Sequence, residues 1–387
     1  MLRKFLYGVA ALSFIVLLKP SYTWNTFLPG IAITLFSFIL FLQKGKKSTS
    51  GSGVLLVLLF LISLYNLRDL SVSSLLSFLI FLVFISNNKI KLDVYYYCKT
   101  LYALLISLSI VVFILVVYVG IDIPYYMIDA TNASKRYDYF QYPLLLVAND
   151  PIHPVGFFRF HFFFDEPGVV GTIAAIIMIM ENYSLKKWQN IAIFISGLLS
   201  LSLFFIIISF FFLLVFKIRS VKGIITLFFV SNVIGAAVWY VDDNYFGVTE
   251  LIGGRLEFEN GKLAGDTRSN DTFDRVYDNF IREGDGLLFG KGVEAHARIA
   301  PGIQTYKMII YDNGIIYFFL VISFYLLFAV KELYRCRSKA LLYFVFWLAL
   351  YYQRPAYVFE VAYFYLLTLV PYYWKTEMRE APCQNKK

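Results

Sequence analysis

The feature that most constrains this chain is the length of its apolar runs. Stretches such as 98–120 and 306–329 contain few charged residues, and about 20 such residues are what an α-helix needs to cross a bilayer. The runs are continuous, whereas the strands of a membrane β-barrel would alternate apolar and polar residues. Only 16% of the 387 residues are charged, against roughly a quarter in soluble domains. The sequence therefore predicts an all-α, polytopic membrane protein.

Twelve candidate spans can be placed, and together they predict a single integral membrane domain over 1–387. We place them at 4–19, 26–43, 53–67, 70–87, 98–120, 167–183, 189–201, 203–216, 222–240, 306–329, 340–353 and 356–374. The first span starts like a signal sequence. Lys19 and Pro20 follow it in place of a small-residue cleavage site, so we expect it to remain in the protein. Between 188 and 216 the sequence leaves open one long helix or a hairpin of two short ones.

The distribution of positive charge sets the expected topology. The formal net charge of +9 could by itself indicate nucleic-acid binding. Lys and Arg, however, concentrate in the short loops between candidate spans, as the positive-inside rule requires of cytoplasmic segments. Both flanks of 188–216 are basic, which favours the hairpin, broken near Ser200 and Ser202. We therefore expect both termini in the cytoplasm and no nucleic-acid partner.

Two long polar loops, about 121–166 and 241–305, are then left on the outer side of the membrane. The second contains Arg255, Arg268, Arg275, Arg282 and Arg298. Long loops cross a membrane regardless of their charge, so topology does not explain these arginines. The three cysteines all fall on the predicted inner side, and their spacing suggests no metal site. We therefore expect no metal and no other cofactor.

Within the second loop, the pattern of 271–282 predicts an amphipathic helix. Its apolar residues recur at the spacing i, i+3, i+4, i+7 and i+8 of one helix face; they are Phe273, Val276, Tyr277, Phe280 and Ile281. Asn270 is a suitable N-cap and Gly284 a suitable stop.

Two arginines of this helix, Arg275 and Arg282, fall almost opposite its apolar face. If that face packs on the membrane domain, both arginines point into open space or a cleft. The alternative is that each forms a local ion pair, with Asp271 and Asp278 respectively, which stabilises a helix by only a few tenths of a kcal/mol. Arg268 precedes the helix and has no such local partner, which favours a functional role.

The first loop ends in Arg159-Phe-His-Phe-Phe-Phe-Asp-Glu-Pro167 and leads directly into a candidate span. Pro167 suits the first turn of a helix, because its missing N–H would be unpaired there. Asp165 and Glu166 then lie at the helix N-terminus, where the helix dipole stabilises negative charge. A capping carboxylate and a general base are the two roles that remain open.

Charged residues inside spans are costly and mark functional sites. Asp312, Arg354 and Glu360 all lie at the outer ends of spans, where they can line the same cavity as the loop residues. An internal ion pair between Arg354 and Glu360 is the alternative. Glu181 lies near the inner end of a span, and we expect it to snorkel to the surface.

These elements together resemble the O-antigen polymerases of bacterial polysaccharide assembly, the Wzy type. The similar motifs are Arg159 with the following FFFDEPGVVGT, the arginines Arg268 and Arg275 ahead of LLFGKG, and Asp312-Asn-Gly-Ile-Ile at the start of a span. The related O-antigen ligases have a histidine just before this span, where the present chain has Gln304-Thr-Tyr-Lys307. The family more often has Glu where Asp312 stands.

The resemblance implies a metal-independent, inverting glycosyltransferase of lipopolysaccharide biosynthesis in the bacterial inner membrane. It would move a growing glycan from undecaprenyl diphosphate to the next lipid-linked repeat unit at the periplasmic face. Both lipid-linked glycans, the bilayer and a chain-length regulator protein are the implied partners. Arginines would bind the diphosphate; the candidates are Arg159, Arg268, Arg275, Arg282, Arg298 and Arg354, with Asp312 and Glu360 as further substrate-binding residues.

The acceptor hydroxyl requires a base, and Glu166 is the first candidate, with Asp165, His161 and Asp312 in reserve. An O-antigen ligase of the same fold is one alternative function. A flippase for the lipid-linked unit is another, but the span centres lack the cationic cavity that such a transporter needs.

Overall fold

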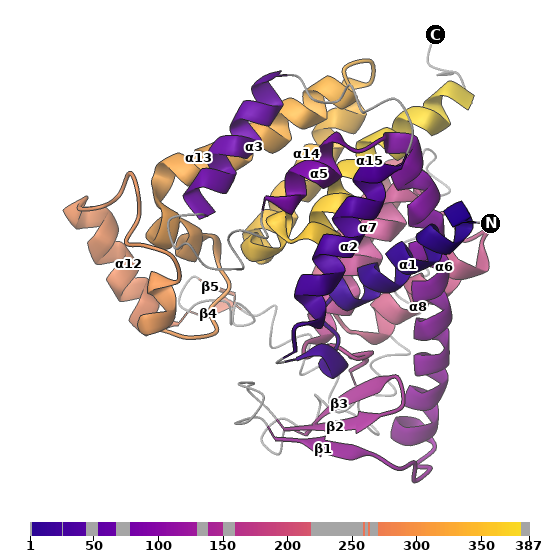
Figure 1. Cartoon of the computed structure of the whole chain (residues 1–387). Coiled ribbons are helices and arrows are strands. Elements are labelled where there is room, and N and C mark those ends of the chain that lie inside the picture. Colours follow the sequence, from indigo (N-terminus) through magenta and orange to yellow (C-terminus); the bar gives the residue numbers. More distant parts are fainter. Residues whose placement is uncertain are drawn as a thin grey trace. The chain divides into compact units, whose positions relative to one another are not determined.

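The computed structural model describes residues 2–24, 26–43, 53–66, 78–129, 138–149, 159–217, 258–259, 262–263 and 270–380. This part of the chain is mostly helical and divides into two compact units, each with its own packing (Figure 1). The first unit comprises Met1–Leu18, Phe27–Cys98 and Thr267–Lys387, and the second comprises Lys19–Thr26 and Lys99–Asp266. The expectation of a single membrane domain remains a prediction.

The helices of the first unit are α1 (Leu2–Leu17), α2 (Leu28–Leu42), α3 (Gly53–Asn66), α5 (Leu79–Ile85), α12 (Asp271–Glu283), α13 (Tyr306–Glu332), α14 (Arg337–Gln353) and α15 (Val361–Glu380), with the 3₁₀ turns η6 (Ala295–Arg298) and η7 (Pro355–Phe359). Helix α6 (Asn88–Phe113) starts in this unit and continues in the second, where Ile114–Tyr118 extends it as a π-helix. The second unit adds η1 (Ser21–Thr23), β1 (Tyr126–Ile128), β2 (Asp138–Tyr142), β3 (Leu145–Asn149), α7 (Pro167–Met180), α8 (Trp188–Leu199), α9 (Leu203–Lys217), β4 (Phe258–Glu259) and β5 (Lys262–Leu263).

Among the described residues, two helices are long and apolar enough to cross a membrane, Asn88–Tyr118 and Tyr306–Glu332. The shorter apolar helices of the described ranges have 10–17 residues. The expectation of a mostly helical chain is therefore confirmed, while twelve spans and their topology remain a prediction. The candidate span at 222–240 lies outside the described residues.

Helices α8 and α9 are separate, and the chain turns between them at Ser200–Ser202. The rings of Phe194 and Phe205 lie 5.8 Å apart, so α9 folds back along α8. A Cβ atom on Gly197 would lie 2.5 Å from the Phe205 ring, which is why glycine is required at this close approach. The predicted break into two short helices is confirmed.

Helix α13 packs against α3 and α14 in the first unit (Figure 1). Aromatic rings fill these contacts: Tyr325 stacks on Trp347 with centroids 4.5 Å apart, and Phe324 packs on Phe84 and Phe364. This aromatic core explains part of the high aromatic content of the sequence, and it holds α13 in place at the candidate site.

Helix α7 belongs to the second unit, and every residue from Pro167 to Met180 except Gly168 is buried. At its end, Glu181 is buried as well. Its Oε1 accepts a hydrogen bond from Lys99 Nζ at 2.5 Å, and the Asn190 side chain donates to its Oε2 at 3.4 Å. The expectation that Glu181 snorkels to the surface is wrong, because these buried partners satisfy its charge in place.

A small three-stranded antiparallel sheet occupies part of the loop 121–166, in the order β1-β2-β3. The amide of Leu146 donates to the carbonyl of Phe162, and the hydroxyl of Ser21 donates to the Gln141 side chain. The sheet is thereby joined to the aromatic segment that precedes α7. The all-α expectation missed this sheet, because its strands are only 3 to 5 residues long and carry no clear alternation.

Candidate functional site

Helix α12 has the limits that its sequence predicts. The Asn270 side chain accepts a hydrogen bond from the Phe273 amide at 2.8 Å and so caps the first turn. Gly284 ends the helix in the left-handed conformation, with φ of 71° and its amide bonded to the Phe280 carbonyl. A side chain with a Cβ atom would be strained at that φ. These local signals confirm the predicted N-cap and stop.

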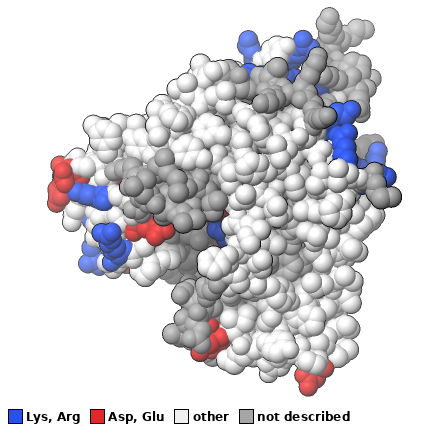
Figure 2. All heavy atoms as spheres, viewed as in Figure 1, with Lys and Arg blue, Asp and Glu red and all other residues white. Residues whose placement is uncertain are grey.

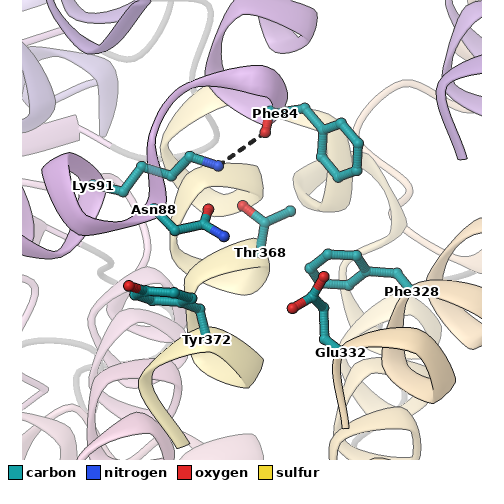
Figure 3. A pocket seen from close by; sticks show the side chains of 7 residues that line it. All are labelled: Phe84, Asn88, Lys91, Phe328, Glu332, Thr368 and Tyr372. Carbon is teal, nitrogen blue, oxygen red and sulfur yellow. Dashed lines mark hydrogen bonds between the residues drawn. The ribbon is translucent and has the colours of Figure 1, made fainter. Parts of the chain in front are cut away.

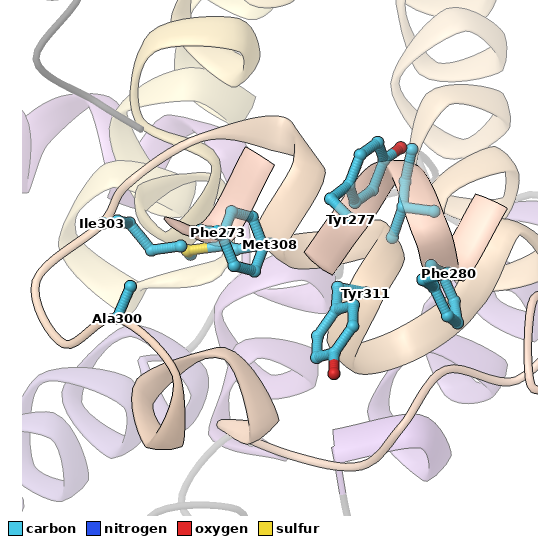
Figure 4. Packing of buried hydrophobic residues seen from close by; sticks show 8 residues of the cluster. Phe273, Tyr277, Phe280, Ala300, Ile303, Met308 and Tyr311 are labelled. Carbon is cyan, nitrogen blue, oxygen red and sulfur yellow. The ribbon is translucent and has the colours of Figure 1, made fainter. Parts of the chain in front are cut away.

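The apolar face of α12 packs on the first turns of α13 (Figure 4). Phe273, Tyr277 and Phe280 are buried there, together with Met308 and Tyr311. The rings of Phe280 and Tyr311 lie 5.0 Å apart. Each fully buried side chain of this size contributes on the order of 1.5–3 kcal/mol. The helix is therefore fixed to the first unit by its apolar face.

An ion pair supports the same contact: Lys307 Nζ of α13 lies 2.8 Å from Asp274 Oδ1 of α12, and both side chains are mostly buried. The Lys307 ammonium also lies over the Tyr277 ring, 5.4 Å from its centroid. Burial raises the pKa of Tyr277 to about 12, so this phenol stays protonated at neutral pH.

The arginines of α12 remain exposed once its apolar face is buried. Arg275 and Arg282 are both on the solvent side, and neither forms an ion pair or hydrogen bond within the described part of the chain. The local pairs that the i,i+4 spacing allows with Asp271 and Asp278 are not formed. Arg298 in η6 is likewise exposed without a described partner. Figure 2 shows charged side chains gathered over α12 and the chain that follows it.

Helix α13 is broken at Gly314, which has φ of 82° and ψ of 171°. The turn that follows α12 packs its backbone into this break. The amides of Lys291 and Gly292 donate to the carbonyls of Tyr311 and Asp312, at 2.8 and 3.0 Å. In return, the amides of residues 315 and 316 donate to the carbonyls of residues 287 and 288, at 2.9 and 3.3 Å. The break therefore leaves these peptide groups paired with one another, as buried backbone groups generally are.

We expect Gly290→Ala to loosen this turn. Gly290 has φ of +78°, and a Cβ atom there would lie 2.2 Å from the carbonyl oxygen of Asp312. The strained φ costs about 1–2 kcal/mol and the clash with backbone about 1–3 kcal/mol more. Gly302→Ala is the matched control, because Gly302 has φ of +85° and open space around it. Thermal unfolding in detergent should show the larger loss for Gly290→Ala; equal losses would contradict the proposed contact.

The broken helix also positions a histidine–aspartate pair. His296 Nδ1 lies 2.5 Å from Asp312 Oδ2, and the His296 backbone amide donates to Asp312 Oδ1 at 2.9 Å. The carboxylate is 6% exposed and the imidazole 13%. Asp312 therefore has a defined partner that the sequence does not predict, and its place in a functional site remains a prediction. The only sequence signal for His296 is its position in the polar loop 241–305, which the charge distribution predicts to lie outside the membrane.

Two further predicted residues lie in the first unit, next to η7. Arg354 is buried, and its Nη1 donates to the Tyr357 hydroxyl at 2.6 Å while the guanidinium lies over the Tyr357 ring. Glu360 is half-buried between η7 and α15. The structure thus places both at the turn joining α14 to α15. Their roles in substrate binding remain predictions.

The remaining described candidates belong to the second unit. Arg159 is half-buried, and its Nε donates to the Ser200 carbonyl at 3.3 Å. Glu166 occupies the N-cap position of α7 with extended backbone, but its side chain does not cap the helix. Asp165 is half-buried beside it, and its carbonyl accepts a hydrogen bond from the Tyr139 hydroxyl at 3.0 Å. The capping role is therefore not observed for Glu166. Arg255 and Arg268 lie outside the described residues.

His161 is 3% exposed, and neither ring nitrogen has a hydrogen-bond partner among the described residues. Burial, together with the nearby positive charge of Arg159, lowers the pKa of His161 to about 3. An enclosed imidazole that stays neutral has no open route to an acceptor hydroxyl. This environment does not favour His161 as the reserve base, and that role remains a prediction.

The buried imidazole of His161 makes stability depend on pH. The unfolded chain protonates this histidine near pH 6.5 and the folded chain only near 3, so the unfolded state binds more protons between these values and stability falls as pH falls. Each pKa unit of difference between the folded and unfolded states corresponds to about 1.4 kcal/mol of stability. We expect His161→Phe to remove about 2 kcal/mol of the loss between pH 6.5 and 5. Denaturant unfolding of both proteins at these two pH values measures it, and identical pH slopes would contradict it.

A separate polar pocket lies in the first unit, where α6 starts and α13 ends (Figure 3). Lys91, Glu332 and Thr368 line it, and Lys91 Nζ donates to the Phe84 carbonyl at 3.0 Å. Its empty space is about 200 Å³, none of it wide enough for a water molecule. The pocket is too tight for a sugar, so α12 and its surroundings are the better candidate site.

No protein-family model matches this chain, and neither the curated proteins nor the solved structures contain a match. Within the described ranges, no group of three or more His, Cys, Asp or Glu side chains is arranged to hold a metal ion. The described part of the chain is mostly helical, with two helices long and apolar enough to span a membrane and a docked, arginine-bearing helix.

Proposed function

We propose that this protein is an O-antigen polymerase of the bacterial inner membrane. It joins repeat units linked to undecaprenyl diphosphate at the periplasmic face, by inverting glycosyl transfer without a metal. The proposal includes twelve spans with both termini in the cytoplasm, of which the two long apolar helices are compatible members. The donor glycan, the acceptor glycan and a chain-length regulator are its proposed partners.

The observation that carries the proposal is the set of exposed guanidinium groups on a firmly docked scaffold. Arg275, Arg282 and Arg298 have no described ion-pair partner, while α12 is buried along its other face. Exposed arginines that form no described ion pair are a suitable receptor for a diphosphate. Each guanidinium group can bind a phosphate with two parallel hydrogen bonds. Those bonds strengthen as negative charge develops on the leaving diphosphate.

A ligase would use the same donor, so the products must separate the two functions. In a strain that lacks this protein, we expect surface glycan with single repeat units still attached to the lipid A core, because ligation continues without polymerisation. Electrophoresis of extracted lipopolysaccharide measures this. Complete loss of repeat units from the core would instead indicate a ligase, and an accumulation of cytoplasm-facing lipid-linked units would indicate a flippase.

The sequence-based choice of base is testable in the same reaction. If Glu166 removes the proton from the acceptor hydroxyl, Glu166→Gln should lower the rate about 10²–10⁴-fold. Purified protein with a lipid-linked repeat unit provides the measurement. Retention of most of the polymerising activity would exclude Glu166 as the base.

A further inference from the structure

We propose that His296, oriented by Asp312, is the general base that takes the proton of the acceptor hydroxyl. The inference rests on the glycosyl transfer proposed above and assigns its base to the first unit instead of to Glu166. In this assignment His296 contacts substrate, and Asp312 is a positioning residue.

The two hydrogen bonds to Asp312 fix both the orientation and the tautomer of the imidazole. One carboxylate oxygen accepts the backbone amide of His296, and the other lies 2.5 Å from Nδ1 of its ring. An ionised carboxylate can only accept, so Nδ1 must carry the hydrogen. Nε2 is then the basic nitrogen, and the imidazole ring makes no other hydrogen bond among the described residues.

Asp312 is itself held in place, so the pair is preorganised. Its carbonyl accepts the amide of Gly292, and it lies two residues before the break of α13 at Gly314. The carboxylate is deeper than the ring, at 6% against 13% exposure. A buried carboxylate behind a more accessible imidazole is the order found in acid–base pairs, where the carboxylate stabilises the imidazolium that forms.

The turn η6 carries both kinds of group that the reaction needs. His296 supplies a base, and Arg298, two residues further on, supplies an exposed guanidinium. An imidazole suits the role because its ordinary basicity lies close to neutral pH, where a general base is most effective. The base and part of the diphosphate receptor are thus built on one short segment.

The transfer step balances without any other reactant. The acceptor O–H bond breaks and its proton moves to Nε2 of His296, while the oxygen electron pair forms a bond to the anomeric carbon of the donor. The bond from that carbon to the diphosphate oxygen breaks, and its electron pair leaves with the lipid diphosphate. Attack opposite the leaving group inverts the anomeric centre. The imidazolium then returns its proton to solvent.

The test uses the purified full-length protein with defined undecaprenyl-diphosphate-linked repeat units. We expect His296→Ala to lower kcat about 10²–10⁴-fold and added imidazole to restore part of the rate in proportion to its concentration. His296→Gln, which fills the space, should lose the rate without rescue. Glu294→Gln is the control. Glu294 lies two residues before His296, its side chain is exposed, and it takes no part in the proposed reaction.

The positioning role of Asp312 is tested by measuring kcat and KM separately for variants of this residue. Asp312→Asn should lower kcat at least tenfold with little change in the KM of the donor, and Asp312→Glu should recover part of the loss. A fall in the folded fraction, measured by gel filtration and thermal unfolding, would instead account for a purely structural role and would overturn this assignment.

The outcomes also separate this inference from the function on which it rests. An active wild-type protein whose His296→Ala and His296→Gln variants keep at least half of kcat overturns the base and leaves the polymerase standing. Loss of activity in Glu166→Gln, with His296 variants active, transfers the role to Glu166. A wild-type protein that consumes no lipid-linked donor overturns both proposals.

Discussion

Arg275→Ala combined with Arg282→Ala is expected to abolish polymerisation while the protein still inserts and folds. Both side chains are exposed and have no described partner, so their loss leaves no buried charge behind. Each charge-assisted hydrogen bond to the diphosphate is worth about 1.5–3 kcal/mol, which corresponds to a factor of about 10–150 in rate for each arginine. The glycan length in a complemented deletion strain measures the effect.

The controls for this prediction distinguish charge from geometry. Lysine at both positions should restore only part of the activity, because an ammonium group lacks the planar fork that binds phosphate with two bonds. Arg337→Ala removes an exposed arginine at the start of α14 and should leave glycan length unchanged. Wild-type chain lengths in the double alanine variant would overturn the assignment of these arginines to the donor. Arg268→Ala, outside the described residues, is expected to have the same effect.

Glu181→Ala is expected to cause the largest loss of stability. It would leave the ammonium group of Lys99 buried without its carboxylate, and breaking a buried pair in this way costs about 3–5 kcal/mol. The two side chains are each 2% exposed, and the Asn190 side chain bonds to both. Thermal unfolding in detergent, with the yield of folded protein, measures the change.

A double variant identifies the cause of that loss. Lys99→Met with Glu181→Met should recover most of the stability, because well-packed apolar side chains replace a buried pair at little cost. Lys187→Met is the control for charge alone, since Lys187 lies 3.3 Å from Glu181 but is 48% exposed. Equal unfolding temperatures for Glu181→Ala and the wild type would contradict a structural role of the pair.

The parts of the site that the sequence predicts correctly are those encoded locally. Asn270 and Gly284 set the limits of α12 because a cap and a stop act within one turn of helix. The phase of Arg275 and Arg282 follows from the periodicity of the apolar residues alone. The positive charge on both flanks of 188–216 likewise predicts the break between α8 and α9.

The parts that the sequence does not predict depend on distant segments meeting. His296 and Asp312 are 16 residues apart, and they meet because the turn after α12 packs into the break at Gly314. No periodicity encodes that contact. The burial of Glu181 depends in the same way on Lys99, which lies 82 residues away.

The i,i+4 spacing alone does not predict whether Arg275 and Arg282 form ion pairs. The i,i+4 rule allows Asp271 and Asp278 to pair with them, yet an exposed pair of this kind is worth only about 0.3–0.5 kcal/mol. So small a gain does not hold two long side chains in one geometry. Apolar length alone does not set the limits of the candidate spans, since several described apolar helices have only 10–17 residues.

The most direct test of the account is to incubate the purified protein with a defined undecaprenyl-diphosphate-linked repeat unit, without divalent metal. We predict a ladder of lipid-linked glycans that differ by one repeat, with inverted configuration at each new linkage and release of undecaprenyl diphosphate. Repeat units that stay single in the presence of folded wild-type protein would contradict the proposed function.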